Sequence, residues 1–305
     1  YVKWESAFSG GTGTINDPYQ ISTIQQLNIV REFPNSSYIL MNDLDLGQAT
    51  QEGGQYWNNG QGWMSIGKNT VIFSGNFDGN NKKISNMYST INGLFYNVNG
   101  SIIKNLGLEN VNIPSTDGQA GMLVGNISTS IVTNCYAKGN IFGNSYTGGL
   151  VGNSFSVYYT NCFTEGSVTG VDNVGGLVGI VDGNNQSTID SCHSVANVTG
   201  QSLLGGLIGY ATNVNTSKSY AVGDISGVNN SIGGFVGSYS NGTINSCTAS
   251  GNVVMTGNNS FRVGGFAGYI SGTTTNCYSV GSVTVDESTD DIGGFTGNYV
   301  GNVSN

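Results

Sequence analysis

The sequence predicts an all-β protein: a right-handed parallel β-helix (β-solenoid) of about ten turns with a short helical N-terminal cap. Three observations predict it: an extreme composition, a repeated glycine motif, and short segments in which apolar and polar residues alternate. Of 305 residues, 49 are glycine, three are proline and 9% are charged. So much glycine excludes a helical bundle, because each glycine inside a helix costs about 1 kcal/mol relative to alanine. The hydrophobic fraction of 37% is enough for a core, which argues against a disordered chain.

The glycine motif recurs along most of the chain. From residue 92 it reads NGLFY, AGMLVG, GGLVG, GGLVG, GGLIG, GGFVG, GGFAG and GGFTG. Its large apolar residue returns every 27 to 31 residues, at Leu94, Leu123, Leu150, Leu177, Leu207, Phe235, Phe266 and Phe295. This unit is too short for a four-stranded propeller blade and suits one solenoid turn of about three short strands joined by glycine bends. Stacked turns lie about 4.8 Å apart, so equivalent residues form ladders along the axis.

A second motif confirms this register. Four copies of it read NCYAKGNI, NCFTEGSV, SCTASGNV and NCYSVGSV. In the first copy Cys135, Ala137 and Ile141 alternate with Tyr136 and Lys138, a period of two that predicts a strand with its small and apolar residues inward. The cysteines are interpreted as buried thiols, one per turn and without the paired spacing of a zinc site, with a disulfide between adjacent turns as the alternative. They are Cys135, Cys162, Cys192, Cys247 and Cys277.

Residues 1–91 lack the repeat and are predicted to form the N-terminal cap and the first turns. Residues 92–305 are predicted to form the repeats, in one continuous domain whose last turn is incomplete. Ser22 or Thr23 can cap a short helix in which Ile24, Leu27 and Val30 share one face. This helix is expected to cover the first turn, because an uncovered strand edge pairs with other chains.

The GGLVG and NCYAKG-like segments resemble the GLUG-motif repeat of secreted and surface proteins of bacteria and archaea. The resemblance covers roughly residues 70–305. In that family the repeat accompanies adhesins, surface-layer-like proteins and non-catalytic parts of large secreted proteases, so the resemblance implies an exported scaffold. An extracellular or cell-surface location is therefore expected, and a start at Tyr1 in place of Met fits a processed or excised segment.

Charge and hydropathy limit the partners. The formal charge of −9 argues against binding to nucleic acid or to anionic membrane surfaces. No apolar run approaches the roughly 18 residues that a membrane span needs. We expect no cofactor, and as partners either further copies of the chain or a glycan or protein at the cell surface.

One outward ladder is a candidate interaction site. It contains the only histidine, His193, in the position that aromatic residues occupy in other turns. A histidine beside a cysteine, as at His193 and Cys192, could indicate a catalytic pair. The repeat instead favours the interpretation that His193 is one member of the aromatic ladder. The ladder is predicted to stack on sugar rings or to pack copies laterally, with packing under a loop as the structural alternative. Its members are Tyr136, Phe163, His193, Tyr220 and Tyr278.

The competing hypothesis is a β-helix enzyme that cuts polysaccharides. Such enzymes need converging carboxylates, or Arg and Lys often with calcium. The carboxylates of this chain are dispersed, so the prediction is that it is not an enzyme and has no catalytic residues. Asp43, Asp45 and Asp78 are interpreted as turn and edge residues. The densest acidic group is a weak calcium candidate or a solvated loop: Asp286, Glu287, Asp290 and Asp291.

The C-terminal turn gives the assembly hypothesis. After Phe295 the next inward residue is due beyond Asn305, so the chain is either a fragment or has its last edge occupied by another molecule. Phe295, Tyr299 and Val300 form the predicted assembly edge for head-to-tail stacking into a filament or surface layer. The predicted function is a non-catalytic extracellular structural or adhesive β-solenoid. The alternative is a polysaccharide-binding or polysaccharide-degrading (lyase or hydrolase) β-helix protein.

Overall fold

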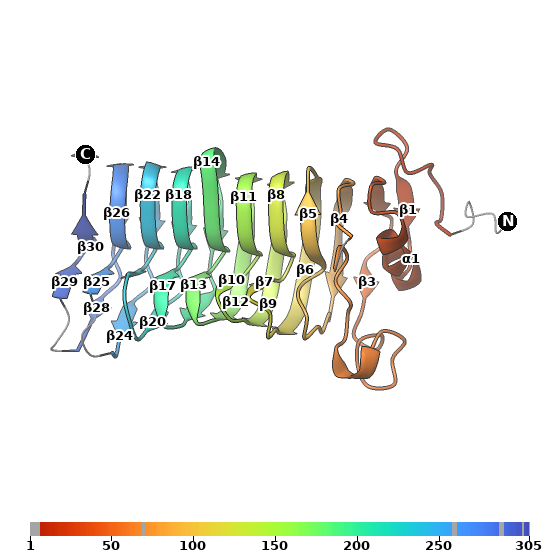
Figure 1. Cartoon of the computed structure of the whole chain (residues 1–305), viewed down its shortest axis with the longest axis horizontal. Coiled ribbons are helices and arrows are strands. Elements are labelled where there is room, and N and C mark those ends of the chain that lie inside the picture. The colour runs from red at the N-terminus through yellow and green to blue at the C-terminus, as the bar shows by residue number, and fades with distance from the viewer. Residues whose placement is uncertain (1–6, 69–70, 258–260, 287–289, 301, 305) are drawn as a thin grey trace.

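The chain forms an all-β, right-handed parallel solenoid of about eight turns (Figure 1). This computed structural model describes residues 7–68, 71–257, 261–286, 290–300 and 302–304. The predicted fold class is confirmed, but about ten turns were expected. One reason for the difference is that residues 47–61 form turns and the short 3-10 helix η3 (Asn58–Gly60) instead of a regular coil.

The described strands form two sheets, of 24 and seven strands, in which the strand pairs are parallel. A bend in each turn divides the larger sheet into two faces. The first face contains β1 (Tyr19–Ile21), β2 (Tyr38–Leu40), β4 (Phe77–Ser85), β5 (Phe95–Asn99), β6 (Ile102–Pro114), β8 (Val124–Thr133), β11 (Val151–Thr160), β14 (Val178–Asp190), β18 (Ile208–Ser217), β22 (Val236–Asn245), β26 (Ala267–Thr275), β30 (Thr296–Tyr299) and β31 (Asn302–Ser304).

The C-terminal ends of β4 and β6 extend past the bend into the second face. It contains β3 (Leu44–Asp45), β9 (Tyr136–Phe142), β12 (Phe163–Thr169), β15 (His193–Ser194), β16 (Asn197–Thr199), β19 (Tyr220–Ala221), β20 (Ile225–Gly227), β23 (Thr248–Ala249), β24 (Val253–Met255), β27 (Tyr278–Ser279) and β28 (Val283–Thr284). The seven-stranded sheet consists of β7 (Gln119–Gly121), β10 (Tyr146–Gly148), β13 (Asp172–Gly175), β17 (Ser202–Gly205), β21 (Ile232–Gly233), β25 (Phe261–Gly264) and β29 (Asp290–Gly293).

The bend between the two faces explains the asparagine of the NC motif and the equivalent Asn105 of the turn before it. Asn105, Asn134 and Asn161 have φ of 55°, 53° and 54°, a left-handed conformation that asparagine tolerates better than most residues. Their side chains also join adjacent turns, since Nδ2 of Asn134 donates to Oδ1 of Asn105 at 3.0 Å and Nδ2 of Asn161 donates to Oδ1 of Asn134 at 3.2 Å. The same residue type therefore turns the chain and holds the stack together.

The core is built from single files of equivalent residues. Leu150, Leu177 and Leu207 are fully buried, and the backbone N–H of each of the first two donates to the carbonyl of the next, at 2.8 and 2.9 Å. Phe266 continues the file as a stacked ring between Phe235 and Phe295, with centroids 4.7 and 4.8 Å apart. The predicted ladder of the glycine motif is confirmed. All five cysteines are free, four of them buried and Cys277 half-buried.

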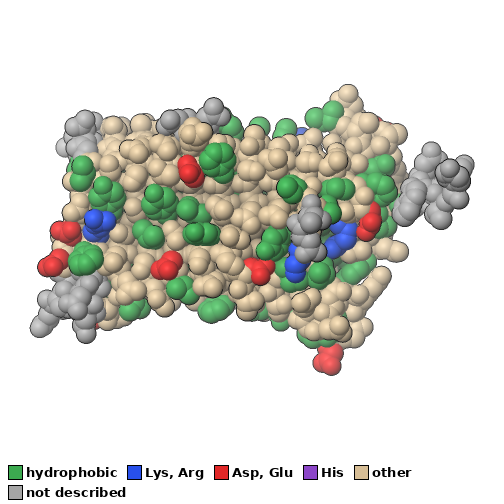
Figure 2. Space-filling model, viewed as in Figure 1, with side chains coloured by type: hydrophobic (Ala, Val, Ile, Leu, Met, Phe, Trp, Pro, Cys, Tyr) green, Lys and Arg blue, Asp and Glu red, His purple; other side chains and the backbone are tan. Residues whose placement is uncertain are grey.

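The predicted N-terminal helix is present as α1 (Ile24–Ile29), followed by the 3-10 helix η2 (Val30–Glu32). Thr23 is its cap and accepts a hydrogen bond from the backbone of Gln26 at 3.2 Å. Leu27 and Val30 are fully buried in the core, and α1 lies beside β1 at the N-terminal end of the stack (Figure 1). On the face drawn in Figure 2, charged side chains are few, and hydrophobic side chains are scattered over an otherwise polar surface.

Candidate functional site

The predicted aromatic ladder is a continuous stack of rings over four turns. Phe163 pairs in register with Tyr136 on one side and with His193 on the other, and His193 pairs with Tyr220. Successive ring centroids are 4.9, 4.9 and 4.5 Å apart, with planes within 7° of parallel. Tyr278 lies two turns beyond Tyr220, because Thr248 occupies the ladder position between them.

This stacking determines which surface the ladder presents. The ring faces of Phe163 and His193 are covered by their neighbours, and the outer face of Tyr136 lies over Gly107, where a Cβ atom would be 2.4 Å from the ring. The hydroxyl of Tyr136 donates to Oε1 of Glu109 at 2.9 Å. A sugar packs on the face of an aromatic ring, whereas this ladder offers mainly edges. Its binding role stays a prediction, and Tyr220 and Tyr278, which are 41% and 58% exposed, are not packed under a loop.

His193 and Cys192 do not form a catalytic pair. Cys192 immediately precedes β15 and is buried in the core, whereas the ring of His193 lies outside it, stacked between Phe163 and Tyr220. Cys192 is fully buried, and burial raises the pKa of its thiol. Burial also lowers the pKa of His193, against a smaller opposing effect of Glu165.

The predicted calcium candidate does not form a cluster in the described part of the chain. Asp286 is exposed, and Glu287 lies outside the described residues. Asp290 and Asp291 belong to β29, where Oδ2 of Asp291 accepts a hydrogen bond from Asn298 at 2.9 Å. Among the residues that the structure describes, no three His, Cys, Asp or Glu side chains converge as a metal site.

The residues of the predicted assembly edge have three different environments. Phe295 stacks on Phe266, and the hydroxyl of Tyr299 donates to the carbonyl of Gly272 at 3.1 Å. Val300 is 58% exposed. The first two therefore pack against the preceding turn, and their role in assembly stays a prediction.

A cavity of about 600 Å³ lies near the N-terminal end, where the segment with η3, orange in Figure 1, projects from the side of the stack. We call it the Trp57 pocket. Its lining comes from β3, the segment before η3, the residues after β4, and β6. The lining residues are Asp45, Gly47, Gln48, Gln51, Glu52, Trp57, Asn86, Met87, Tyr88, Asn110 and Asn112.

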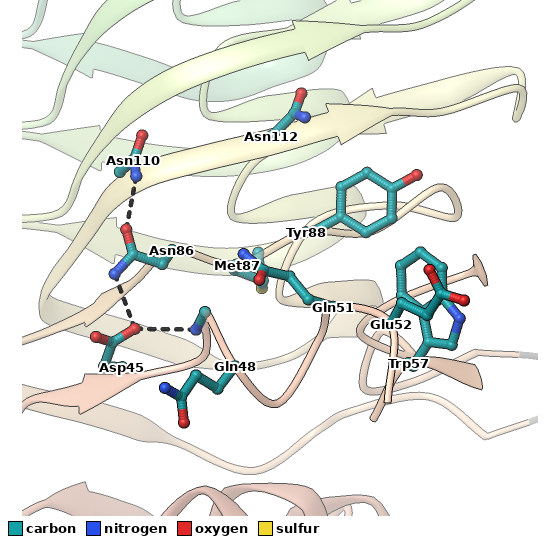
Figure 3. A pocket seen from close by; sticks show the side chains of 11 residues that line it. Asp45, Gln48, Gln51, Glu52, Trp57, Asn86, Met87, Tyr88, Asn110 and Asn112 are labelled. Atoms are coloured by element: carbon teal, nitrogen blue, oxygen red, sulfur yellow. Dashed lines mark hydrogen bonds between the residues drawn. The ribbon is translucent and has the colours of Figure 1, made fainter. Parts of the chain in front are cut away.

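One side of the Trp57 pocket is a chain of polar side chains (Figure 3). Oδ1 of Asp45 accepts hydrogen bonds from Nδ2 of Asn86 at 2.8 Å and from the backbone N–H of Gly47 at 2.9 Å. Asn110 in turn donates to Oδ1 of Asn86 at 2.6 Å. The bonds from Asn86 and Gly47 lower the pKa of Asp45, which keeps its carboxylate ionised. No described donor contacts Oδ2 of Asp45, so this oxygen is free to accept a bond from a ligand.

The other side of the pocket is aromatic. The rings of Trp57 and Tyr88 have centroids 5.9 Å apart and planes inclined by 27°, and both side chains are half-buried. Tyr88 follows β4 and forms a bridge with Asn112 of β6. The two sides together combine flat apolar surface with several hydrogen-bonding groups, the composition of a small-molecule site.

The segment that carries Trp57 is held in place by buried contacts. Trp63 is fully buried, and its backbone N–H donates to the carbonyl of Tyr88 at 2.8 Å. Gly62 has a φ of 69°, and a Cβ atom there would lie 2.2 Å from that same carbonyl, so only glycine allows this approach. Tyr56 packs edge-on against Trp63, with ring centroids 5.8 Å apart. These contacts therefore fix the chain on both sides of Trp57.

Reasoning from the sequence missed this pocket. It interpreted Asp45 as a turn residue and did not consider Trp57 or Tyr88. A usable signal was present, since residues 49–63 interrupt the strand pattern and contain two of the three tryptophans. Irregular segments on a rigid scaffold often carry function.

Comparisons with known proteins give partial matches in sequence. No protein-family model matches the chain. It is 31% identical over 131 residues, 40% of its length, to the "Putative Gly-rich membrane protein" of Evansella cellulosilytica. It is also 31% identical over 149 residues, 46% of its length, to the "Halomucin" of Haloquadratum walsbyi. The matches span 14% and 2% of the lengths of those two proteins.

Two solved structures share the fold. One is a crystal structure of a "putative immunoglobulin A1 protease" from Bacteroides ovatus, with a TM-score of 0.69 and 20% identity over 98% of this chain and 87% of that chain. The other is named "IgA1 Protease", with a TM-score of 0.65 and 18% identity over 92% of this chain and 22% of that chain. At these identities the likeness shows the fold.

These names correct one prediction. We expected that the protein is not an enzyme, because stacked repeats assemble no obvious catalytic group. That expectation is wrong, since both solenoids of this fold carry the name of a protease, an enzyme class. The architecture alone therefore does not argue against an enzyme. No helix in the described part of the chain is long and apolar enough to cross a membrane.

Proposed function

We propose that this chain is a carbohydrate-binding β-solenoid of an extracellular or cell-surface protein, with the sugar held in the Trp57 pocket. The observation that carries the proposal is the pairing of Trp57 and Tyr88 with the polar chain of Asp45, Asn86 and Asn110 around one cavity. Its volume of about 600 Å³ lies within the usual range of ligand sites, about 300–1,000 Å³.

The chemistry of a sugar ring matches both sides of the pocket. The C–H face of the ring packs on the face of the Trp57 indole that Tyr88 does not cover, as apolar surface packs on aromatic rings. The hydroxyl groups at the rim donate to Oδ2 of Asp45 and exchange hydrogen bonds with amides such as Gln51. Each such bond contributes about 0.5–1.5 kcal/mol, so a few of them together with one stacked ring give about 2–6 kcal/mol, which corresponds to affinity in the millimolar range.

The rest of the solenoid serves in this proposal as a rigid support that holds the pocket away from the body of a larger protein. The motifs GGLVG and NCYAKG support membership of the GLUG-motif repeat family, which we retain as a proposal. One relative is named as a membrane protein, which supports a surface location. A sugar-binding pocket on a protein at the cell surface would give adhesion to surface glycans.

Titration calorimetry against a panel of neutral oligosaccharides tests the proposal. At least one should bind, and Trp57→Ala or Tyr88→Ala should weaken its binding at least ten-fold. Tyr220→Ala, which removes a ring of the aromatic ladder, is the matched control and should bind the sugar as tightly as the wild type does. Equal binding by Trp57→Ala and the wild type would contradict the proposal.

The names of the two solved structures favour a second candidate function, participation in proteolysis. Here the solenoid belongs to a protease and contributes to substrate binding. The test is incubation with immunoglobulin A1 and with casein, followed by mass spectrometry of the products. Defined fragments that appear with the wild type and not with buffer would support this candidate, and intact substrates would count against it.

A further inference from the structure

We infer that the Trp57 pocket selects glycans that carry a protonated amino group and rejects acidic ones. This inference rests on the proposed function and names the ligand class of the same site. Two carboxylates, Asp45 and Glu52, line the pocket, and no Lys, Arg or His is among its lining residues.

The two carboxylates are placed to act on one bound ligand. Figure 3 shows Asp45 at one side of the pocket, and Glu52 with Trp57 at the other. A sugar in the pocket therefore meets a lining that carries two carboxylates and no cationic side chain. An ammonium group on that sugar also meets the face of Trp57, the aromatic ring that attracts cations most strongly.

Asp45 carries its charge under all ordinary conditions. The hydrogen bonds from Asn86 and Gly47 engage only Oδ1 and stabilise the ionised form. Oδ2 is therefore open to a donor on the ligand, and an ammonium group is a stronger donor to a carboxylate than a hydroxyl group is.

The neighbouring charges do not cancel this field. The nearby Lys83 is already paired, with its Nζ 2.8 Å from Oε2 of Glu109. Asp43, which accepts the backbone N–H of Lys83 at 3.0 Å, adds a further negative charge on this side. With a formal charge of −9 on the whole chain, an acidic sugar meets repulsion both at long range and in the pocket.

The size of the preference follows from the exposure of the two carboxylates. Both side chains are exposed, so solvent screens each ion pair, and we expect a gain of at most about five-fold in affinity per carboxylate. Together they give about ten-fold at low ionic strength. Salt at 0.5 M should remove most of it, because the screening length then falls to a few ångströms, on the order of 4 Å.

The experiment is titration calorimetry at pH 5.5 with three trisaccharides of matched linkage, built from glucosamine, N-acetylglucosamine and glucuronic acid. The wild type should bind the glucosamine trisaccharide about ten-fold more tightly than the N-acetylated one, and the acidic one most weakly. In the double variant Asp45→Asn, Glu52→Gln the first two affinities should become equal. Asp286→Asn, Asp290→Asn removes the same charge at the far end and should leave the preference intact.

Two results would overturn the inference alone: binding of the acidic trisaccharide as tight as that of the glucosamine one, or a preference that persists in the double variant. Absence of binding for all three, and for the neutral panel, would overturn the proposed function and the inference with it. Thermal unfolding of each variant checks that the fold is retained, and Asp45→Asn alone keeps an oxygen acceptor for Asn86 and Gly47 if the double variant is unstable.

Discussion

Phe163 and His193 stack face to face across adjacent turns, with ring centroids 4.9 Å apart and planes inclined by 3°. The pair belongs to a stack that continues to Tyr136 and Tyr220, so one residue from each turn contributes a ring. Stacked aromatic pairs stabilise proteins by about 0.5–1.5 kcal/mol beyond the area they bury. The aromatic ladder therefore helps to fix the register of adjacent turns and stabilises the stack.

His193 should make stability depend on pH. Burial lowers its pKa in the folded state, whereas the unfolded chain titrates near 6.5. Between the folded pKa and pH 6.5 the unfolded state therefore binds more protons than the folded state. The contribution of His193 to the free energy of unfolding is fully present above about pH 6.5 and is lost as the pH falls through the folded pKa. The fall should be small, because the ring is half-exposed. Urea unfolding at pH 7.5, 6.5 and 5.5 measures it.

The sequence contains one histidine, which gives this prediction a sharp control. His193→Phe keeps a ring between Phe163 and Tyr220 and removes the titrating group. The wild type should lose stability relative to this variant as the pH falls. An identical pH profile for the two proteins would contradict the prediction.

The close packing of glycines should make the repeat intolerant of a single methyl group. A Cβ atom at Gly175 would lie 1.9 Å from the carbonyl oxygen of Val178 and 2.6 Å from the backbone nitrogen of Gly209. We expect Gly175→Ala to lower the free energy of unfolding by about 3 kcal/mol or more, because backbone atoms cannot move aside as side chains do. Thermal or urea unfolding measures the loss.

Gly118 provides the matched substitution. A Cβ atom there would meet no other atom within 4 Å. Gly118→Ala should therefore leave the free energy of unfolding within about 0.5 kcal/mol of the wild type. Equal effects of the two substitutions would show that close backbone contact is not what requires glycine in the motif.

Cys277 should be the most reactive thiol. It is half-buried, and hydrogen bonds from the side chain and the backbone N–H of Cys247 stabilise its thiolate, which lowers its pKa. Cys135 and Cys192 are buried, and burial raises the pKa of each. At pH 8, iodoacetamide should modify Cys277 first, and the other cysteines should react only after unfolding.

Peptide mapping after a short reaction checks this order. Cys277→Ser should remove the fast phase and leave the slow one. Modification of Cys135 in the native protein at the rate of Cys277 would contradict the assigned burial.

The fold class could be predicted from the sequence, although not the number of turns, because each turn repeats the same local requirements. The leucine of GGLVG must be buried, the asparagine of NC turns the chain, and the glycines allow adjacent turns to approach. Leu177 could therefore be placed in the core from spacing alone, whereas the bend at Asn134 was recognised only in the structure. Spacing also placed Phe163 and His193 in one ladder, but it could not tell that their ring faces would cover each other.

The Trp57 pocket has no such periodic signal. Its shape depends on contacts between residues far apart in the chain, such as the approach of Gly62 to Tyr88 and the bond from Asn110 to Asn86. Asp45 looks like an ordinary turn aspartate until these partners are known. Residues 49–63 depart from the strand pattern, which indicates an irregular segment. The conformation of that segment depends on the burial of Trp63, which the strand pattern does not predict.

The most direct test of the account is the position of a bound sugar. Diffraction from crystals of the chain grown with the tightest-binding oligosaccharide should show a sugar ring on Trp57, with a donor within hydrogen-bonding distance of Oδ2 of Asp45. A sugar bound along the ladder of Tyr136, Phe163 and His193, with the Trp57 pocket empty in the same crystal, would contradict it.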